Sequence, residues 1–155
     1  DLKDRGIGFE TVTLHVGAGT FASLTQDNLN AGKLHSEFYA VSEGVLNRIS
    51  ETRKNGKRVI AVGTTALRTL ESLPEDLSGL NGVSGTTDIF IRPGYSFQYV
   101  DALITNFHLP RSSLFMLVSA FMGTDVMQAA YAHAINSGYS FYSYGDACLL
   151  MPQND

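Results

Sequence analysis

A short apolar run between two helix-like segments most constrains the fold of this chain. Residues 58–62 (RVIAV) form a continuous run that is typical of a strand covered on both faces. The segment before it has apolar residues at helical spacing behind Ser42, a plausible N-cap. The segment after it predicts a helix from Thr64 that Pro74 stops. This alternation of strand and helix predicts an α/β fold with a mixed open sheet and helices packed against it.

The rest of the chain predicts further short elements. Residues 9–16 alternate between apolar and polar side chains, as a half-buried strand does. Other strands are expected at residues 35–41, 87–91 and 97–104, and a short apolar segment ends the chain at residues 148–151. Helices are expected over residues 112–122, capped by Ser112 or Ser113, and over residues 125–135, capped by Asp125. Segments rich in Gly, Ser and Asn predict loops at residues 17–30 and 74–85.

Composition narrows the class of protein. The chain has 155 residues, of which 44% are hydrophobic and 17% charged, as in a globular protein with a real core. We expect no membrane helix and no disulfide, because apolar runs are short and Cys148 is the single cysteine. A soluble, cytoplasmic protein is therefore expected. The net charge of −4 counts against a free-standing nucleic-acid binder, although four basic residues between positions 53 and 58 form a local patch: Arg53, Lys54, Lys57 and Arg58.

A glycine-rich segment follows the first expected strand. The motif G-x-G-x-x-A includes Gly17 and Gly19 with Thr20 beside them, and glycines there let a backbone approach a ligand closely. A dinucleotide site is one interpretation, but the residues after the motif make a poor helix. A tight turn and a loop that approaches another ligand are the alternatives. His15 precedes the motif at a strand end, where α/β sheets build sites.

A second segment combines an expected strand with polar side chains. His35 and Glu37 lie two apart on an expected strand, where side chains point the same way and could form an acid/base pair. The alternative is an exposed polar strand face. The chain has four histidines, but none of the usual metal-ligand spacings occurs, so no metal site is expected.

The segment after residues 58–62 places hydroxyl groups at a helix start. Thr64 and Thr65 could cap this helix, bind an anion at its N-terminus, or do both. Arg68 lies one turn further and could hold a carboxylate in a bidentate fork. The alternative is a capped helix with a surface arginine.

Polar residues also surround one aromatic ring near the end of another expected strand. Asp101, Asn106 and His108 lie close to Phe107 in sequence, an arrangement that could recognise a flat heterocycle by stacking and edge hydrogen bonds. Turn chemistry is the alternative, since asparagine is common in turns. Near the C-terminus, an aromatic run that we expect to lie mostly in the core ends in a turn that directs the carboxylate of Asp146.

Taken together and in this order, these segments resemble the S-adenosylmethionine:tRNA ribosyltransferase-isomerase family. The matching stretches cover nearly the whole chain: VTLHVGAGTF (12–21), HSE (35–37), RVIAVGTTALRTLES (58–72), IFIRPGYSF (89–97), VDALITNFHLPRSSLFMLVSAFMG (100–123) and YSFYSYGDACL (139–149). The chain departs from the family pattern at Ser140, where the family has arginine, so one phosphate or carboxylate contact is not expected here.

The resemblance implies a reaction and its substrates. The family transfers and isomerises the ribosyl part of S-adenosylmethionine onto 7-aminomethyl-7-deazaguanine at the wobble position of tRNA with a GUN anticodon. Epoxyqueuosine-tRNA forms, and adenine and methionine are released. S-adenosylmethionine is thus a consumed co-substrate, and neither a metal nor a nicotinamide is implied.

Roles for individual residues follow from that reaction. The resemblance makes His15, His35 and Glu37 the acid/base candidates, and Gly17, Gly19 and Thr20 the lining of a nucleoside pocket. Binding of the methionine carboxylate or of a tRNA phosphate is assigned to Thr64, Thr65 and Arg68. Binding of a nucleobase is assigned to Asp101, Asn106, Phe107 and His108, with Asp146 as a further candidate.

The resemblance also implies the place of this chain in a longer protein. Residues 1–155 correspond to a single unit, the C-terminal portion of a larger multi-sheet α/β domain, without the family's N-terminal half and its inserted β-rich domain. One alternative is a non-catalytic piece that binds S-adenosylmethionine or tRNA only. A nicotinamide-dependent oxidoreductase built on the GAGTFA segment is the other.

Overall fold

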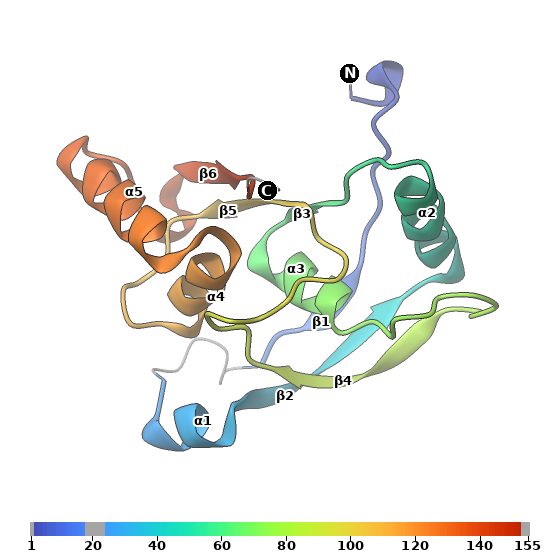
Figure 1. Cartoon of the computed structure of the whole chain (residues 1–155), viewed down its shortest axis with the longest axis horizontal. Helices are drawn as coiled ribbons and strands as arrows, with labels where there is room; N and C mark the ends of the chain where they lie inside the picture. Colours follow the sequence, from blue (N-terminus) through green and yellow to red (C-terminus); the bar gives the residue numbers. More distant parts are fainter. Residues whose placement is uncertain (1, 18–23, 153–155) are drawn as a thin grey trace.

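The protein combines two small sheets with helices packed between and beside them (Figure 1). A computed structural model describes residues 2–17 and 24–152. Helices and strands alternate along most of the chain, as an α/β architecture requires. The helices are α1 (Gln26–Ala31), α2 (Glu43–Lys54), α3 (Thr64–Glu71), α4 (Ser113–Met122) and α5 (Thr124–Asn136), with short 3-10 turns at Lys3–Arg5 and Tyr142–Tyr144.

The first sheet is antiparallel, in the order β1 (Thr13–His15), β2 (Lys33–Val41) and β4 (Val83–Ile89). Its register pairs His15 with Phe38 and Phe38 with Thr86. Along β2, buried Tyr39 and Val41 alternate with an exposed Phe38, so one face of this sheet points to the core and the other to solvent.

The second sheet is mixed, in the order β3 (Ile60–Val62), β5 (Ala102–Asn106) and β6 (Ala147–Leu150). β3 pairs with β5 in parallel, and β5 pairs with β6 antiparallel. Ala61, Leu103 and Leu150 face the core. Since adjacent parallel strands end at the same edge of a sheet, the segments after β3 and β5 are neighbours.

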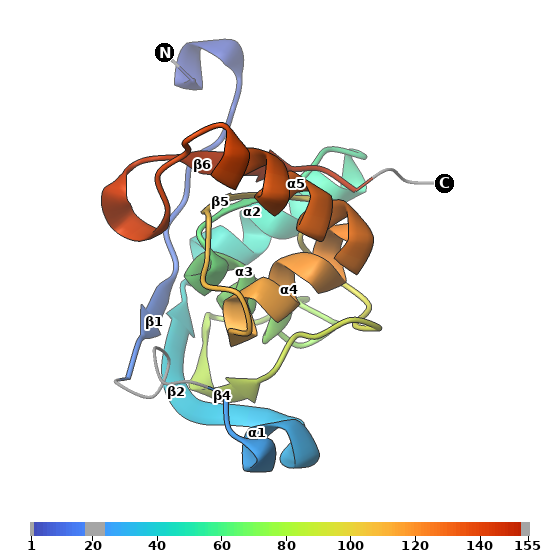
Figure 2. The same cartoon turned by 90° about the vertical axis from the view of Figure 1, so that its left-hand side faces the viewer.

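Helix α3 lies at the centre of the molecule and contacts strands of both sheets (Figures 1 and 2). Its apolar residues Leu67 and Leu70 belong to the main core. Its last residue, Glu71, is buried and accepts hydrogen bonds from the backbone N–H groups of residues 98, 99 and 100 and from the hydroxyl of Tyr95. This carboxylate fixes the segment that leads into β5, because charged acceptors hold N–H donors strongly.

Helices α4 and α5 are joined at Gly123, where they bend by 115°. Gly123 has φ +92°, which favours glycine over any residue with a side chain. Within the described residues, no single helix is long and apolar enough to cross a membrane, and only this bent pair passes that test together.

The mixed α/β fold is confirmed, but several local predictions were wrong. The first strand covers only Thr13–His15, and a short helix, α1, occupies part of the expected loop because Thr25 and Asn28 form a reciprocal capping box. β4 and β5 start at residues 83 and 102 instead of 87 and 97. Asp125 lies inside the first turn of α5, after the N-cap Gly123. The strand at residues 60–62 is not covered on both faces, because no described element lies over its outer side.

Candidate functional site

The candidate site lies where β3 and β5 end side by side. The chain leaves β3 through Gly63 into α3, and it leaves β5 through Asn106 into the segment before α4. The N–H of Gly63 donates to the carbonyl of Ile104 at 2.8 Å, which ties the two strand ends together. Ligands of α/β proteins bind at this kind of edge, beyond the carboxyl ends of parallel strands. We refer to Gly63–Thr65, Asn106–His108 and Asp146 as the carboxyl-edge site.

The N-terminus of α3 supplies backbone donors to this site. Gly63 is the N-cap residue, with φ +90°, and no side chain caps the helix. The prediction that Thr64 or Thr65 caps α3 through its side chain was therefore wrong, because both residues lie inside the first turn. Thr64 is half-buried and Thr65 is exposed. Uncapped N–H groups and the positive end of the helix dipole suit an anionic group.

Asn106 and Asp146 meet at the end of β5. The side-chain amide of Asn106 donates to the carbonyl of Asp146 at 3.3 Å. The Asp146 carboxylate accepts from the backbone N–H of Ser140 at 2.5 Å. Asp146 is thus directed by a turn, as predicted, and it closes the loop between residues 140 and 146.

His108 is held in a mostly buried, uncharged setting. Its Nε2 lies 3.0 Å from the Thr105 hydroxyl, and its backbone N–H donates to the Tyr131 hydroxyl at 2.9 Å. Burial lowers the pKa of His108 to about 4, because the charged imidazolium would lose its hydration. Burial also raises the pKa of Tyr131 to about 12. Both groups are therefore neutral near pH 7.

Phe107 lies in the core and not on an open surface. Its ring packs against the rings of three aromatic residues from α5 and the segment that follows it, at centroid distances of 5.2–5.7 Å: Tyr131, Tyr139 and Phe141. Stacking on a substrate base would require a free ring face, so these contacts give Phe107 a packing role in this structure. The backbone carbonyl of Phe107 accepts from the N–H of Tyr142, which has φ +64°.

Asp101 does not lie near the other residues of its predicted group. It precedes β5, whereas Asn106 ends β5, and five residues of strand span about 16 Å. The Asp101 carboxylate accepts from the backbone N–H of Val59 at 2.7 Å. The prediction of one polar group around one aromatic was thus wrong for Asp101, which instead fixes the start of β3 against the start of β5.

Arg68 and Glu37 form an ion pair inside the protein. Both side chains are buried, and an Nη of Arg68 contacts a carboxylate oxygen of Glu37. A surface arginine on α3 is thus excluded, and the carboxylate that Arg68 meets belongs to β2. The Nε of Arg68 is also buried and has no hydrogen-bond partner in the described part of the chain.

The predicted pairing of His35 with Glu37 on one polar face was wrong. Glu37 is buried and His35 is exposed. The pairing register of β2 with β4 shifts between Lys33 and Glu37, so the simple alternation that would place both side chains on one face is interrupted.

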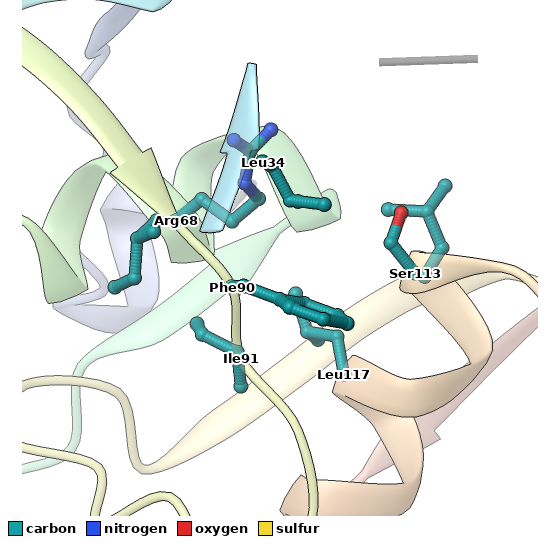
Figure 3. A pocket seen from close by; sticks show the side chains of 8 residues that line it. Leu34, Arg68, Phe90, Ile91, Ser113 and Leu117 are labelled. Carbon is teal, nitrogen blue, oxygen red and sulfur yellow. The ribbon is translucent and has the colours of Figure 1, made fainter. Parts of the chain in front are cut away.

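Arg68 lines a pocket that opens between α3 and α4 (Figure 3). Its empty space measures about 220 Å³, part of which is open to solvent. Its walls come from β2, α3, the end of β4 with the segment after it, and α4: Leu34, Arg68, Ile89, Phe90, Ile91, Ser113, Leu114 and Leu117. Only about 10 Å³ of this space can hold the centre of a water molecule, so the pocket admits about one water and no larger group.

His15 is the last residue of β1, which contacts α3, and Gly17 follows two positions later. The His15 ring is exposed and meets the Phe38 ring edge-on, with centroids 5.3 Å apart. Gly17 is exposed and has open space around its Cα. Gly19 and Thr20 lie outside the described residues.

Comparison with known proteins decides which family this architecture represents. A sequence model described as queuosine biosynthesis protein matches residues 1–150. The chain belongs to the queuosine biosynthesis protein family. It is similar to two proteins named S-adenosylmethionine:tRNA ribosyltransferase-isomerase, with 53% identity to that of Nitrobacter winogradskyi and 58% to that of Methylorubrum extorquens. Each match covers 98% of this chain and 42% or 41% of the relative.

A solved structure supports the same conclusion about the fold of this family member. The crystal structure of S-adenosylmethionine tRNA ribosyltransferase from Thermotoga maritima at 2.00 Å resolution is 43% identical and has a TM-score of 0.77. The match covers 97% of this chain and 47% of that one. The chain therefore spans less than half the length of the relatives that it matches. The assignment of this chain to the C-terminal portion stays a prediction.

Sequence reasoning missed one residue that supports the carboxyl-edge site of this family member and one that fixes the opposite end of β5. Tyr131 on α5 supports His108, and Glu71 at the end of α3 holds the segment that enters β5. Tyr131 lies among apolar helix residues, where a tyrosine reads as packing. Glu71 is the last residue of an apolar helix, a position where a charged side chain is usually exposed. The described residues contain no group of three or more His, Cys, Asp or Glu side chains that could hold a metal.

Proposed function

We propose that this chain is part of an enzyme that transfers and isomerises the ribosyl group of S-adenosylmethionine onto 7-aminomethyl-7-deazaguanine at the wobble position of tRNA with a GUN anticodon. The ribosyl carbon skeleton is joined to the aminomethyl nitrogen, and adenine and methionine leave. The product is epoxyqueuosine-tRNA. S-adenosylmethionine is consumed, and the reaction that we propose uses no metal and takes place in the cytoplasm.

The observation that carries this proposal is the identity of 53–58% with named ribosyltransferase-isomerases over 98% of the chain. The match includes the elements that build the carboxyl-edge site. Because this chain corresponds to 41–42% of those relatives, the activity belongs to the longer protein, and this chain contributes one part of its site.

The geometry supports a division of roles. A base must remove a proton that the neighbouring sulfonium makes acidic, and such a base has to be unprotonated and reachable. His15 and His35 are exposed imidazoles, whereas Glu37 is buried against Arg68. We therefore assign the proton transfer to His15 or His35 and give Glu37 the role of holding Arg68.

Substrate binding is assigned to the carboxyl-edge site and the pocket beside Arg68. The uncapped N-terminus of α3, with Thr64 and Thr65, suits a phosphate or carboxylate group. Hydrogen bonding to the edge of a nucleobase is assigned to the neutral side chains of Asn106 and His108 and to the carboxylate of Asp146. Arg68 is assigned, with Thr64 and Thr65, to the methionine carboxylate or a tRNA phosphate, and its buried Nε has no hydrogen-bond partner among the described residues.

Calorimetric titration of S-adenosylmethionine into the purified 155-residue chain tests the binding part of this proposal, with S-adenosylhomocysteine titrated alongside. We expect saturable binding of both, weakened at least tenfold by Thr65→Val combined with Asn106→Ala, while Val126→Ala on exposed α5 leaves it unchanged. Binding without any turnover on tRNA would support the alternative of a non-catalytic part. No binding by a chain that circular dichroism shows to be folded would contradict the assignment of the pocket to these residues.

The catalytic part is tested in a family-length protein. This chain would replace the matching segment of the Nitrobacter winogradskyi relative, and turnover would be followed by adenine release. His15→Ala or His35→Ala should abolish turnover while leaving the melting temperature unchanged, because both side chains are exposed. Full activity in both variants would remove these histidines from the mechanism.

A further inference from the structure

The mixed sheet has helices on one face only. α3 and α4 lie on one side of β3, β5 and β6, and no described element covers the other side (Figure 1). On that side the register aligns one aliphatic residue from each strand, because Val62 pairs with Ile104 and Ile104 pairs with Leu149. These side chains are 64%, 37% and 58% exposed. Ile60, two residues before Val62, extends the row. We refer to Ile60, Val62, Ile104 and Leu149 as the outer apolar row.

The antiparallel sheet shows what a solvent-facing surface of this protein looks like. Its exposed positions on β1 and β4 are polar (Thr13, His15, Ser84 and Thr86), and the central strand β2 adds one exposed aromatic, Phe38, between them. The outer apolar row contains no polar residue, so the exposed faces of the two sheets differ in chemistry. Strands that read as continuous apolar runs are usually buried on both faces. The sequence of β3 is therefore that of a doubly covered strand, although one of its covers is missing from the described residues.

Polar residues flank the outer apolar row, as they do at the edge of a protein interface. Arg58 before β3 and Asn106 at the end of β5 are exposed polar residues at its two ends. An apolar centre with a polar rim is typical of surfaces that become buried against another protein segment.

We infer that the outer apolar row is the docking surface for the remainder of a family-length chain. The relatives that this chain matches are more than twice as long, since the matches cover 41–42% of two named relatives and 47% of the solved structure. More than half of a family-length protein is therefore available to cover this face. Its occupant is an apolar layer from that remainder, which completes the two-sided covering of β3 and β5.

One substitution in two contexts tests this inference. Val62→Lys would be made in the 155-residue chain and in the family-length protein that carries this chain in place of the matching segment of the Nitrobacter winogradskyi relative. In the short chain the lysine stays in water, and we expect no loss of melting temperature. In the long protein the same lysine would be buried, and we expect a fall of about 5 °C or more. Val126→Lys is the matched control, because Val126 is 54% exposed on α5.

The outcomes separate the occupants of this surface. Equal, small shifts for Val62→Lys and Val126→Lys in the long protein would overturn the inference, because the row would then remain in solvent. If the short chain forms a dimer that Val62→Lys dissociates, while the long protein is unaffected, the occupant is a second copy and the inference is also overturned. Should Val62→Lys prevent the long protein from folding, Val62→Thr supplies a milder change of the same sign, and an unchanged melting temperature in that variant would again contradict docking.

Discussion

Two regions of the molecule bury polar side chains in opposite ways. Around α3 the buried groups are charged, because Arg68 meets Glu37 and the carboxylate of Glu71 meets three backbone N–H groups. At the carboxyl end of β5 the buried groups are neutral, because burial keeps His108 and Tyr131 uncharged.

The difference reflects what surrounds each region. α3 is packed between strands of both sheets, so its charged groups can be met from several directions by fixed partners. Such charges are stable only when they are paired, and removal of one partner is costly. The end of β5 borders the carboxyl-edge site, where neutral donors and acceptors can be rearranged without leaving a buried charge. We therefore expect substitutions near α3 to cost more stability, and changes of pH to act mainly at the end of β5.

The largest effect is expected from loss of Arg68. Arg68→Met should lower the free energy of unfolding by about 3–5 kcal/mol, because Glu37 is left as a buried charge without its guanidinium. Urea unfolding followed by circular dichroism measures this change. The double variant Arg68→Met with Glu37→Leu should recover most of the loss, since no charge remains unpaired. A double variant as unstable as the single one would show that packing, and not charge, holds α3 against β2.

The second effect is a pH dependence that arises from His108. Its folded pKa of about 4 lies below the ordinary value of 6.5, so the unfolded chain binds more protons between these pH values. Stability from this group is fully present above about pH 6.5 and is lost as the pH falls toward 4. The loss amounts to about 3 kcal/mol at pH 4, at about 1.4 kcal/mol for each pKa unit.

Urea unfolding of the wild type and His108→Asn between pH 4 and pH 7 isolates this contribution from that of the carboxylates. As the pH rises from 4 to 7, the free energy of unfolding should increase more for the wild type than for the variant. Parallel curves for the two proteins would mean that the imidazole of His108 takes up its proton at the same pH in the folded and unfolded states, so that burial does not keep it neutral.

These contrasts also show how far the sequence predicted the structure. Periodicity and helix signals predicted α2, α3, α4 and the strand at residues 60–62, because apolar spacing directly reflects which side faces the core. Of the two predicted N-cap candidates, Ser112 and Ser113, the structure has Ser112 as the cap, since its hydroxyl accepts from the N–H of Phe115. The sequence suggested two separate groups of candidate residues, Thr64–Thr65 and Asn106–His108, and the adjacent parallel strands β3 and β5 place both groups at one edge. Their roles in binding stay predictions.

Other features depend on partners that are distant in sequence. Glu37 and Arg68 are 31 positions apart, and the pattern at either position reads as exposed. Asp101 was grouped with Asn106 because the two are close in sequence, but an extended strand separates residues that a loop would keep together. That none of the described elements covers the outer face of β3 could not be predicted, because sequence periodicity indicates that a face is apolar but not which segment covers it.

The third prediction concerns the other charged contact of α3. Glu71→Gln should lower the free energy of unfolding by about 2 kcal/mol, because hydrogen bonds to a charged acceptor contribute about 1.5–3 kcal/mol. The amide keeps one oxygen for the N–H groups of Tyr99 and Val100, but its NH₂ group then faces the N–H of Gln98. Hydrogen exchange should speed up most at residue 98, and Glu75→Gln, an exposed neighbour, serves as the control. Uniform exchange across residues 98–100 would contradict this division of the carboxylate between its donors.

The smallest effect is expected from Tyr131→Phe, which removes one neutral hydrogen bond and preserves the ring contacts with Phe107 and Phe115. The backbone N–H of His108 loses its acceptor, and the cost should be about 1 kcal/mol, the typical value for a neutral pair. Exposed Tyr139→Phe is the matched control and should cost less. A loss from Tyr131→Phe as large as that from Arg68→Met would erase the contrast between the two regions, because a neutral hydroxyl would then stabilise the fold as strongly as a buried charge pair.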